Sequence, residues 1–273
     1  MKKPALLPAL LFMILLAAAC AVPASRAIRQ QYRQLSAAER READSLLAYA
    51  LDHEALFTLA DTLKPMSSMQ LKRLPLLSLV SAQQDSARQA LQRWQQLAAR
   101  LSNQWWVFIV NPFERSDSIY KYAELYVVRR QVLAQLLQNR QDFYAALGLS
   151  SAADPATVLA TTEYEQKYQR WRSYGYLFGY PAHAVDFFVN AGRQQDSTGQ
   201  FVERSFFAIP VFAGAKGYFT YAVPKDYQPQ PIDSNLYKVA SQRLQQYQQL
   251  RQRYSTAQGL QATRLWRALQ QRP

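Results

Sequence analysis

The spacing of apolar residues limits the fold of this chain more than any other feature of its sequence. Between residues 91 and 101, apolar side chains recur every three or four positions, at Leu91, Trp94, Leu97 and Leu101. That repeat places them on one face of a helix, which is the face that a protein buries. The same spacing runs through residues 122–136 and 236–254, so the sequence predicts helices there as well.

Three shorter stretches favour β-strands, because they are rich in aromatic and β-branched residues. Residues 105–110 have the sequence WWVFIV, and Asn111-Pro112 is expected to end this strand. Residues 201–212 and 218–223 flank a loop with two glycines, which predicts an antiparallel hairpin, whereas residues 63–74 are expected to form a loop. The predicted fold class is α+β, mostly helical, with a small antiparallel sheet of about three strands, including the hairpin, packed against helices.

The first 20 residues have the order of an export signal. Lys2 and Lys3 supply a positive start, residues 5–16 form an uncharged apolar run, and small residues follow at positions 17–19. This order is typical of secretory signals, and the apolar run is shorter than the roughly 20 residues that a membrane-spanning helix requires. Residues 1–19 are therefore predicted to be a signal peptide that is removed after export.

Cys20 follows these small residues and is the only cysteine in the chain. The segment from Leu16 to Cys20 resembles the lipobox of bacterial lipoproteins, although Ala17 stands three positions before the cysteine, where leucine is commonest. The resemblance implies that Cys20 is diacylated and becomes the mature amino terminus, so that the membrane is a partner through this acyl anchor. Ordinary cleavage after Ala19 or Ala24 is the alternative.

The chain beyond the signal is long enough for one substantial domain. Residues 20–35 are expected to act as an N-terminal tether, and residues 36–273 as a single, mainly helical α+β domain. Ser36 and Glu39 have the spacing of a capping box, which predicts that a helix starts there. Because no second cysteine is present to form a disulfide, the domain is expected to depend on its hydrophobic core.

Charge is the main compositional clue to a partner. Lys and Arg outnumber Asp and Glu by 32 to 19, which gives a formal net charge of +13. A field of this sign attracts anions such as phosphate-bearing lipids or polymers, although many of the arginines are spread along predicted helices, as on solvated faces. The sequence has no concentrated basic stripe with stacking aromatic residues, so nucleic acid is not an expected partner.

The sequence lacks the commonest catalytic and cofactor-binding motifs. It contains no G-x-S-x-G, no C-x-x-C, no P-loop and no G-x-G-x-x-G. The stretch HEALF, residues 53–57, begins like a zinc-protease helix, but Phe57 occupies the place of the second histidine. No cofactor and no resident metal are therefore expected.

The two histidines are the candidates for catalysis, because each has an acidic neighbour. Glu54 follows His53, and Asp186 lies three residues after His183, on the same face of a predicted helix. If the fold brings both histidines together with these carboxyl groups, they would form a metal site or an acid–base pair. The alternative is a structural role in caps and hydrogen bonds.

Five aromatic residues are candidates for binding. Trp105 and Trp106 are adjacent in a predicted strand, so one ring should enter the core while the other offers a flat surface for a sugar. Tyr174, Tyr176 and Tyr180 fall in a segment with glycines at positions 175 and 179. These tyrosines either line a pocket or pack in the core, where glycine allows another part of the chain to approach closely.

These observations predict an exported bacterial protein of the cell envelope, lipid-anchored on the periplasmic or outer face, or else soluble in the periplasm or secreted. Its expected role is the non-catalytic binding of an anionic or glycan partner through a basic, tyrosine-rich surface. The alternative function is a periplasmic metal-dependent or acid–base hydrolase that uses His53 and His183.

Overall fold

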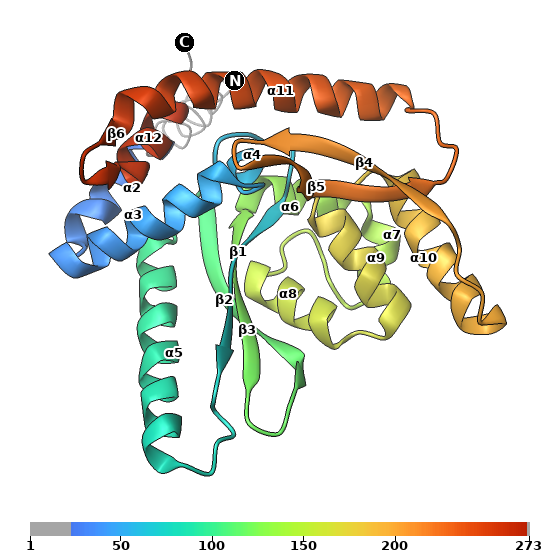
Figure 1. Ribbon diagram of the computed structural model, residues 1–273, viewed down its shortest axis with the longest axis horizontal. Coiled ribbons are helices and arrows are strands. Elements are labelled where there is room, and N and C mark those ends of the chain that lie inside the picture. The colour runs from blue at the N-terminus through green and yellow to red at the C-terminus, as the bar shows by residue number, and fades with distance from the viewer. Residues whose placement is uncertain (1–22, 272–273) are drawn as a thin grey trace, which may run out of the picture.

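The structure, a computed structural model, describes residues 23–271, so the expected signal peptide and Cys20 lie outside the described residues. Small antiparallel sheets of three and two strands pack against a larger helical part, which confirms the predicted α+β class (Figure 1). The strands are β1 (Met66–Leu74), β2 (Trp106–Ser116), β3 (Lys121–Arg129), β4 (Arg204–Val211), β5 (Gly214–Pro224), β6 (Ser255–Thr256) and β7 (Gly259–Leu260). The helices are α2 (Ala24–Gln34), α3 (Ala37–Asp52), α4 (Leu56–Leu59), α5 (Ser81–Leu101), α6 (Arg130–Asn139), α7 (Gln141–Ala146), α8 (Pro155–Tyr164), α9 (Lys167–Leu177), α10 (Ala182–Thr198), α11 (Pro231–Tyr254) and α12 (Ala262–Leu269).

The three-stranded sheet has the order β1-β3-β2, with both pairings antiparallel. Helix α5 packs against β2 on one side, and α8 packs against the same strand from the other part of the molecule (Figure 1). Successive residues of β2 and β3 enter two separate hydrophobic clusters, the first with Phe108, Leu125 and Val127 and the second with Ile109, Tyr126 and Val128. The central part of β2 and β3 is therefore buried on both faces.

Burial on both faces explains why the helix predicted over residues 122–136 is wrong in its first half. A strand that is covered on both sides has no alternation of polar and apolar residues, so its apolar run also fits a helical spacing. Residues 121–129 form β3, and helix α6 begins only at Arg130. Two other expectations are corrected here. Residues 66–74 form β1 and not a loop, and β2 continues through Pro112 to Ser116, because proline is tolerated in an edge strand.

The predicted hairpin is confirmed as β4 and β5, which pair in an antiparallel arrangement. Helix α11 lies along β4, and α10 packs against β5 (Figure 1). The guanidinium group of Arg251, on α11, donates two hydrogen bonds to the Asp52 carboxylate at the end of α3, from Nε at 2.8 Å and from Nη2 at 3.0 Å. These bonds join the end of α11 to the end of α3.

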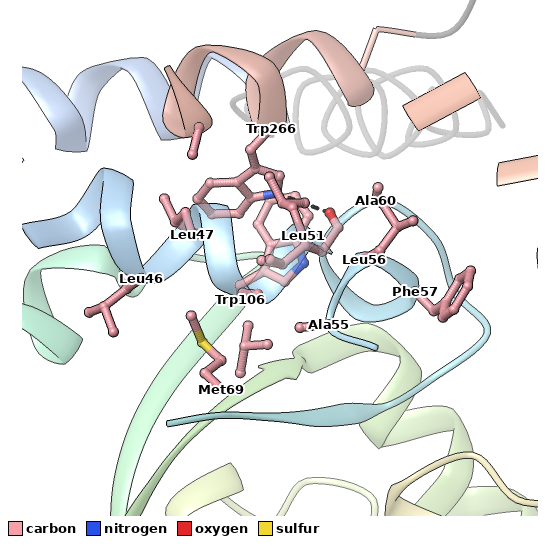
Figure 2. Packing of buried hydrophobic residues seen from close by; sticks show 14 of the residues in the cluster. Leu46, Leu47, Leu51, Ala55, Leu56, Phe57, Ala60, Met69, Trp106 and Trp266 are labelled. Carbon is pink, nitrogen blue, oxygen red and sulfur yellow. Dashed lines mark hydrogen bonds between the residues drawn. The ribbon is translucent and has the colours of Figure 1, made fainter. Parts of the chain in front are cut away.

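Two tryptophans join the N-terminal and C-terminal parts of the core. The rings of Trp106 and Trp266 meet edge to face, with centroids 4.9 Å apart, and both side chains are fully buried (Figure 2). Each indole donates to a backbone carbonyl of α4: Trp106 Nε1 to Thr58 O at 3.1 Å and Trp266 Nε1 to Leu59 O at 3.0 Å. Their hydrogen-bonding groups are thereby satisfied inside the core.

The N-terminal segment differs from the expected tether. Residues 24–34 form helix α2, which packs against α12 and α5, and Ile28 of this helix is buried in the main core. The capping box at the start of α3 is confirmed, since the Ser36 side chain accepts from Glu39 N and the Glu39 carboxylate accepts from Ser36 N at 2.8 Å. Residues 24–34 of the expected tether are thus part of the packed domain.

Candidate functional site

A cavity of about 550 Å³ opens between the end of α3, strands β1 and β3, and the beginning of β5. We call it the α3 cavity. Its wall includes Tyr49, His53, Glu54, Glu124 and Tyr218, together with small polar side chains of β1. The register of β1 against β3 shifts between residues 68 and 70 at this place, and such a bulge redirects side chains beside a site.

His53 lies where α3 ends, with its backbone already extended. Its Nδ1 is 2.7 Å from the carbonyl oxygen of Tyr49, one helical turn earlier. A carbonyl oxygen only accepts, so Nδ1 carries the proton and, in the neutral ring, Nε2 is an acceptor. The imidazole stacks on Tyr49 with centroids 3.9 Å apart and meets Tyr218 edge to face at 4.6 Å. Three rings therefore form one wall of the α3 cavity.

The carboxylate of Glu54 forms an ion pair with Lys64. The Lys64 side chain is fully buried, whereas that of Glu54 keeps 15% of its surface exposed. The ammonium group also lies over the ring of Phe219, with Nζ 4.3 Å from the centroid. Burial lowers the pKa of Lys64, and the charge of Glu54 acts in the opposite direction. One carboxylate of the cavity is thus paired with a buried cation.

Glu124, on the central strand β3, supplies the second carboxyl group. Its Oε2 accepts from the Tyr126 hydroxyl at 2.8 Å. Burial raises the pKa of Glu124 and outweighs the hydrogen bonds from Tyr126 and Ser68, which favour the charged form. The charges of Glu54 and Glu163 raise this pKa further. The cavity therefore holds two carboxyl groups in unequal environments, one beside a buried cation and one that binds its proton more tightly.

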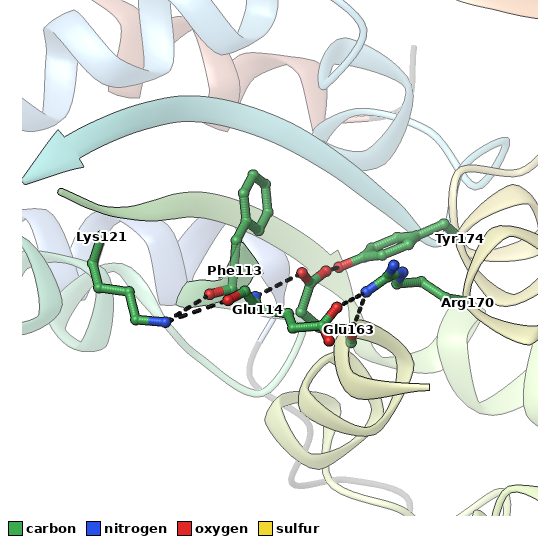
Figure 3. A network of polar contacts seen from close by, with 6 residues as sticks. All are labelled: Phe113, Glu114, Lys121, Glu163, Arg170 and Tyr174. Atoms are coloured by element: carbon green, nitrogen blue, oxygen red, sulfur yellow. Dashed lines mark hydrogen bonds and ion pairs between the residues drawn. The ribbon is translucent and has the colours of Figure 1, made fainter. Parts of the chain in front are cut away.

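Glu124 and Tyr126 also line a second cavity of about 420 Å³, on the side of α8 and α9. There the Tyr174 hydroxyl donates to Glu163 Oε2 at 2.6 Å, and the backbone N–H of Glu114 donates to Glu163 Oε1 at 2.9 Å (Figure 3). Arg170 pairs with Glu114 and donates to the Glu163 carbonyl at 3.0 Å. The polar groups of this network satisfy one another, which suits a structural role.

His183 lies in a different environment from His53. Its Nε2 is 2.8 Å from the Tyr227 hydroxyl and 3.3 Å from Asp233 Oδ1. The Asp233 carboxylate is fully buried and accepts from Tyr227 and, at 2.5 Å, from Tyr221. Burial alone raises the pKa of Asp233, but the hydrogen bonds from these two tyrosines and from the Gln230 backbone hold it below its usual value. This group of residues joins β5 to the start of α11.

The expected partner of His183 is engaged elsewhere, since Asp186 forms its ion pair with Arg172. Asp233 takes the place beside His183 that the spacing assigned to Asp186. His53 contacts Tyr49 and Tyr218, so the two histidines have different ring neighbours. Within residues 23–271, no group of three or more His, Cys, Asp or Glu side chains is arranged to hold a metal ion.

The five aromatic candidates for binding also lie in different places. Trp106 is the ring that enters the core, and Trp105 is half-buried against the same cluster. Tyr174 lines the second cavity, whereas Tyr176 and Tyr180 line a third of about 370 Å³ beside the start of α10. The three tyrosines therefore do not share one pocket in the described part of the chain.

Comparisons of the chain with family models, with curated proteins and with solved structures gave no match. None of the helices in residues 23–271 combines the length and the apolar character that are needed to cross a bilayer.

Sequence reasoning found His53 and Glu54 but missed four neighbours in and behind the α3 cavity: Tyr49, Lys64, Glu124 and Tyr218. Two of them could have been predicted from the sequence. Tyr49 lies four residues before His53 on a helix, a spacing at which side chains touch. Glu124 interrupts an apolar run, as a buried carboxyl group does. Lys64 and Tyr218 reach the site only through tertiary packing.

Proposed function

We propose that this protein is a lipid-anchored, non-catalytic lipoprotein of the cell envelope that binds a glycan in the α3 cavity. The observation that carries the proposal is the wall of three rings beside two carboxyl groups. Tyr49 and Tyr218 expose 53% and 37% of their surface, so both residues are accessible to solvent. Solvent-facing rings of this kind are available to a ligand.

The chemistry of a sugar fits such a wall. Each sugar ring has an apolar C–H face, which packs on an aromatic ring, and an edge of hydroxyl groups, which bond to polar side chains. Glu54 and Glu124 supply acceptors for those hydroxyl protons, and the Gln70 amide supplies both a donor and an acceptor. These side chains recognise a neutral or N-acetylated sugar better than an anion, because the cavity wall carries carboxyl groups.

Attachment to the membrane is supported by the resemblance of residues 16–20 to a lipobox, with Cys20 as the acylated residue. Helix α2 begins at Ala24, so the folded domain would lie within a few residues of the anchor. The test is the intact mass of protein made in a bacterium with its own signal. A mass that fits a chain from Cys20 plus acyl groups is expected, and a mass that fits unmodified cleavage would contradict the anchor.

Glycan binding is tested by calorimetric titration with chitobiose and with chitotetraose, which are neutral N-acetylated saccharides. Tyr49→Ala and Tyr218→Ala should each weaken binding about tenfold, because each removes a stacking surface. Tyr164→Ala is the matched control, since Tyr164 is 59% exposed and lies outside the α3 cavity. Binding that is unchanged in the two cavity variants, or equally weakened in the control, would refute the proposal.

A second candidate function, acid–base hydrolysis of a glycosidic bond, rests on the unequal environments of Glu54 and Glu124. A carboxyl group with a raised pKa can protonate the leaving oxygen, while an ionised one beside it activates water or attacks the sugar. In this hypothesis Glu124 is the acid and Glu54 the base or nucleophile, so the original pair of His53 and His183 is replaced.

The two functions are separated by assaying the same saccharides for new reducing ends. The binding function predicts saturable binding with no turnover. Hydrolysis predicts turnover that Glu124→Gln reduces at least 100-fold while the affinity for the saccharide stays within about threefold. Glu203→Gln is the control, because the Glu203 side chain is exposed and lines neither of the two cavities that contain Glu124.

A further inference from the structure

Five arginines surround a cavity of about 580 Å³ between α2, the start of α3 and α12. They are Arg29, Arg33, Arg40, Arg264 and Arg267, and we call the cavity the arginine pocket. It lies apart from the α3 cavity, with which it shares no lining residue. Its position next to the first described helix distinguishes it from the other cavities.

The arginines are concentrated by helical spacing. Arg29 and Arg33 are four residues apart on α2, and Arg264 and Arg267 are three apart on α12, so each pair lies on one helix face. Helices α2 and α12 pack against each other, which brings the two pairs to the same cavity. Like charges at these spacings repel each other, so folding alone gives no reason to gather them.

No carboxylate of the described residues lies within ion-pair distance of these five guanidinium groups. Asp44 is close, but its oxygens accept from the Tyr32 hydroxyl at 2.6 Å and from Thr263 N and Oγ1 at 2.8 and 2.7 Å. Elsewhere arginines such as Arg172 and Arg251 do have acidic partners. The arginine pocket therefore has an excess of positive charge that an external anion can neutralise.

One of the five is already held in place. Arg40 donates from Nε to the Tyr32 carbonyl at 3.1 Å and from Nη2 to the Arg33 carbonyl at 2.9 Å. These bonds fix its guanidinium plane at the C-terminal end of α2. A pre-oriented guanidinium loses little entropy on binding, and its planar donor fork matches the oxygens of a phosphate group.

We propose that the arginine pocket binds the phosphate group of an anionic lipid headgroup in the membrane to which the chain is anchored. The membrane as the source of the phosphate rests on the proposed attachment at Cys20. Helix α2 begins four residues after Cys20, so Arg29 lies at most about 22 Å along the chain from the anchor. Basic side chains held this close to a bilayer are attracted to anionic lipids, and lipid anchors act together with such a second contact.

The test uses the full chain, made with its own signal and held in a non-ionic detergent. Native mass spectrometry counts bound short-chain lipids during titration with dihexanoyl phosphatidylglycerol, dihexanoyl phosphatidylcholine or inorganic phosphate. Phosphatidylglycerol should bind at least tenfold more tightly than either of the others. Arg33→Gln/Arg267→Gln should weaken its binding at least tenfold, because it removes one guanidinium from each helix.

The matched control is Arg88→Gln/Arg93→Gln, which removes the same charge from exposed positions on α5. It should change the affinity less than twofold. An equal loss in both double variants would overturn the proposal in favour of net charge, and unchanged binding in the pocket variant would overturn it directly. Equal affinity for inorganic phosphate would overturn the membrane as the source.

Two further measurements keep the result interpretable. Arg33→Lys/Arg267→Lys retains the charge but loses the planar donors, so it should bind more weakly than the unaltered chain even if the Gln variant fails to fold. The same spectra give the mass of the chain and therefore its acylation. Binding of the lipid by a chain without acyl groups would contradict the proposed anchor at Cys20. An acylated chain that does not bind the lipid would overturn this inference and leave the anchor unaffected.

Discussion

The ammonium group of Lys64 is fully buried and is paired with the carboxylate of Glu54, the residue that follows His53 in the wall of the α3 cavity. Desolvation disfavours the charged form of lysine, so the pair depends on the negative charge of Glu54. A buried pair adds little to stability over apolar residues, but the removal of one partner leaves an uncompensated charge. Stability and the shape of the α3 cavity are therefore linked through this contact.

Glu54→Gln should lower the free energy of unfolding by about 3 kcal/mol at pH 7, because it leaves the Lys64 charge buried without its partner. Lys64→Met should cost less, since Glu54 still reaches solvent. The double variant Glu54→Gln/Lys64→Met should recover much of the loss. Urea unfolding of the three variants measures the coupling, and purely additive losses would show that the two residues do not depend on each other.

The loss in free energy of unfolding that Glu54→Gln causes should also become smaller as the pH rises. Without the carboxylate, the pKa of Lys64 falls further below its unfolded value of about 10.4. The folded chain then binds fewer protons than the unfolded chain above that lowered pKa, so stability rises with pH toward 10. Unfolding curves at several pH values between 7 and 10 check the sign.

A second prediction concerns Asp233, whose buried carboxylate accepts from Tyr221 and Tyr227 beside His183. Asp233→Asn should cost about 2 kcal/mol at pH 7, because it replaces charged hydrogen bonds by a group with one acceptor oxygen. Asp226→Asn, at an exposed position nearby, is the control and should cost less than about 0.5 kcal/mol.

The pH dependence of this cost follows from the pKa of Asp233, which is held below its usual value. Stability from such a group is present above the unfolded pKa of about 3.9 and is lost as the pH falls through the folded pKa. The difference between the unaltered chain and Asp233→Asn should therefore narrow below pH 4. A difference that stays constant from pH 7 to pH 3 would contradict the assignment of charge to this carboxyl group.

The sequence was most informative where one face of an element is buried. The stripe at Leu91, Trp94, Leu97 and Leu101 lies on α5 as predicted, because the opposite face of that helix is polar and exposed. Strand β3 was missed because both of its faces are buried, and β1 because this edge strand carries polar residues such as Lys72.

The candidate site was predicted only in part for the same reason. His53 and Glu54 are adjacent in the chain, so local order revealed them. Lys64, Glu124 and Tyr218 come from a loop and two different strands, and their meeting depends on pairing and packing that one sequence does not specify. The partner of His183 illustrates the point, since Asp233 lies 50 residues away in the chain, whereas the nearby Asp186 bonds to Arg172.

A third prediction tests the core between the two ends of the chain. Trp266→Ala should cost about 4 kcal/mol, because it opens a large cavity against Trp106. Trp266→Phe should cost only about 1 to 2 kcal/mol, since the Leu59 carbonyl still accepts from Gln270 Nε2 at 2.9 Å. Leu79→Ala, at a fully exposed side chain, is the control for ordinary surface changes. If thermal unfolding shows that Trp266→Phe lowers the melting temperature as much as Trp266→Ala, the indole hydrogen bond accounts for most of the lost stability.

Alanine substitutions at two glycines with positive φ angles distinguish the cost of backbone strain from the cost of steric contact. Gly179, at the end of α9, has φ +77°, and a Cβ atom there would lie 2.7 Å from the Leu63 carbonyl oxygen and 3.2 Å from Lys64 Cα. Gly199, at the end of α10, has φ +69° with no atom within 4 Å of a Cβ. Gly199→Ala should therefore cost about 1 kcal/mol, from the left-handed conformation alone. Gly179→Ala should cost about 3 kcal/mol or more, because the backbone beside Lys64 must also move.

The same substitution at Gly179 should affect the α3 cavity. A shift of the backbone at residues 63 and 64 displaces the ammonium group from Glu54, so Gly179→Ala should weaken saccharide binding while Gly199→Ala leaves it unchanged. Urea unfolding and calorimetric titration of the two variants measure both effects. Equal stabilities would show that the chain relaxes around Gly179 without strain, and unchanged binding in a destabilised Gly179→Ala variant would show that Lys64 does not position Glu54 for the ligand.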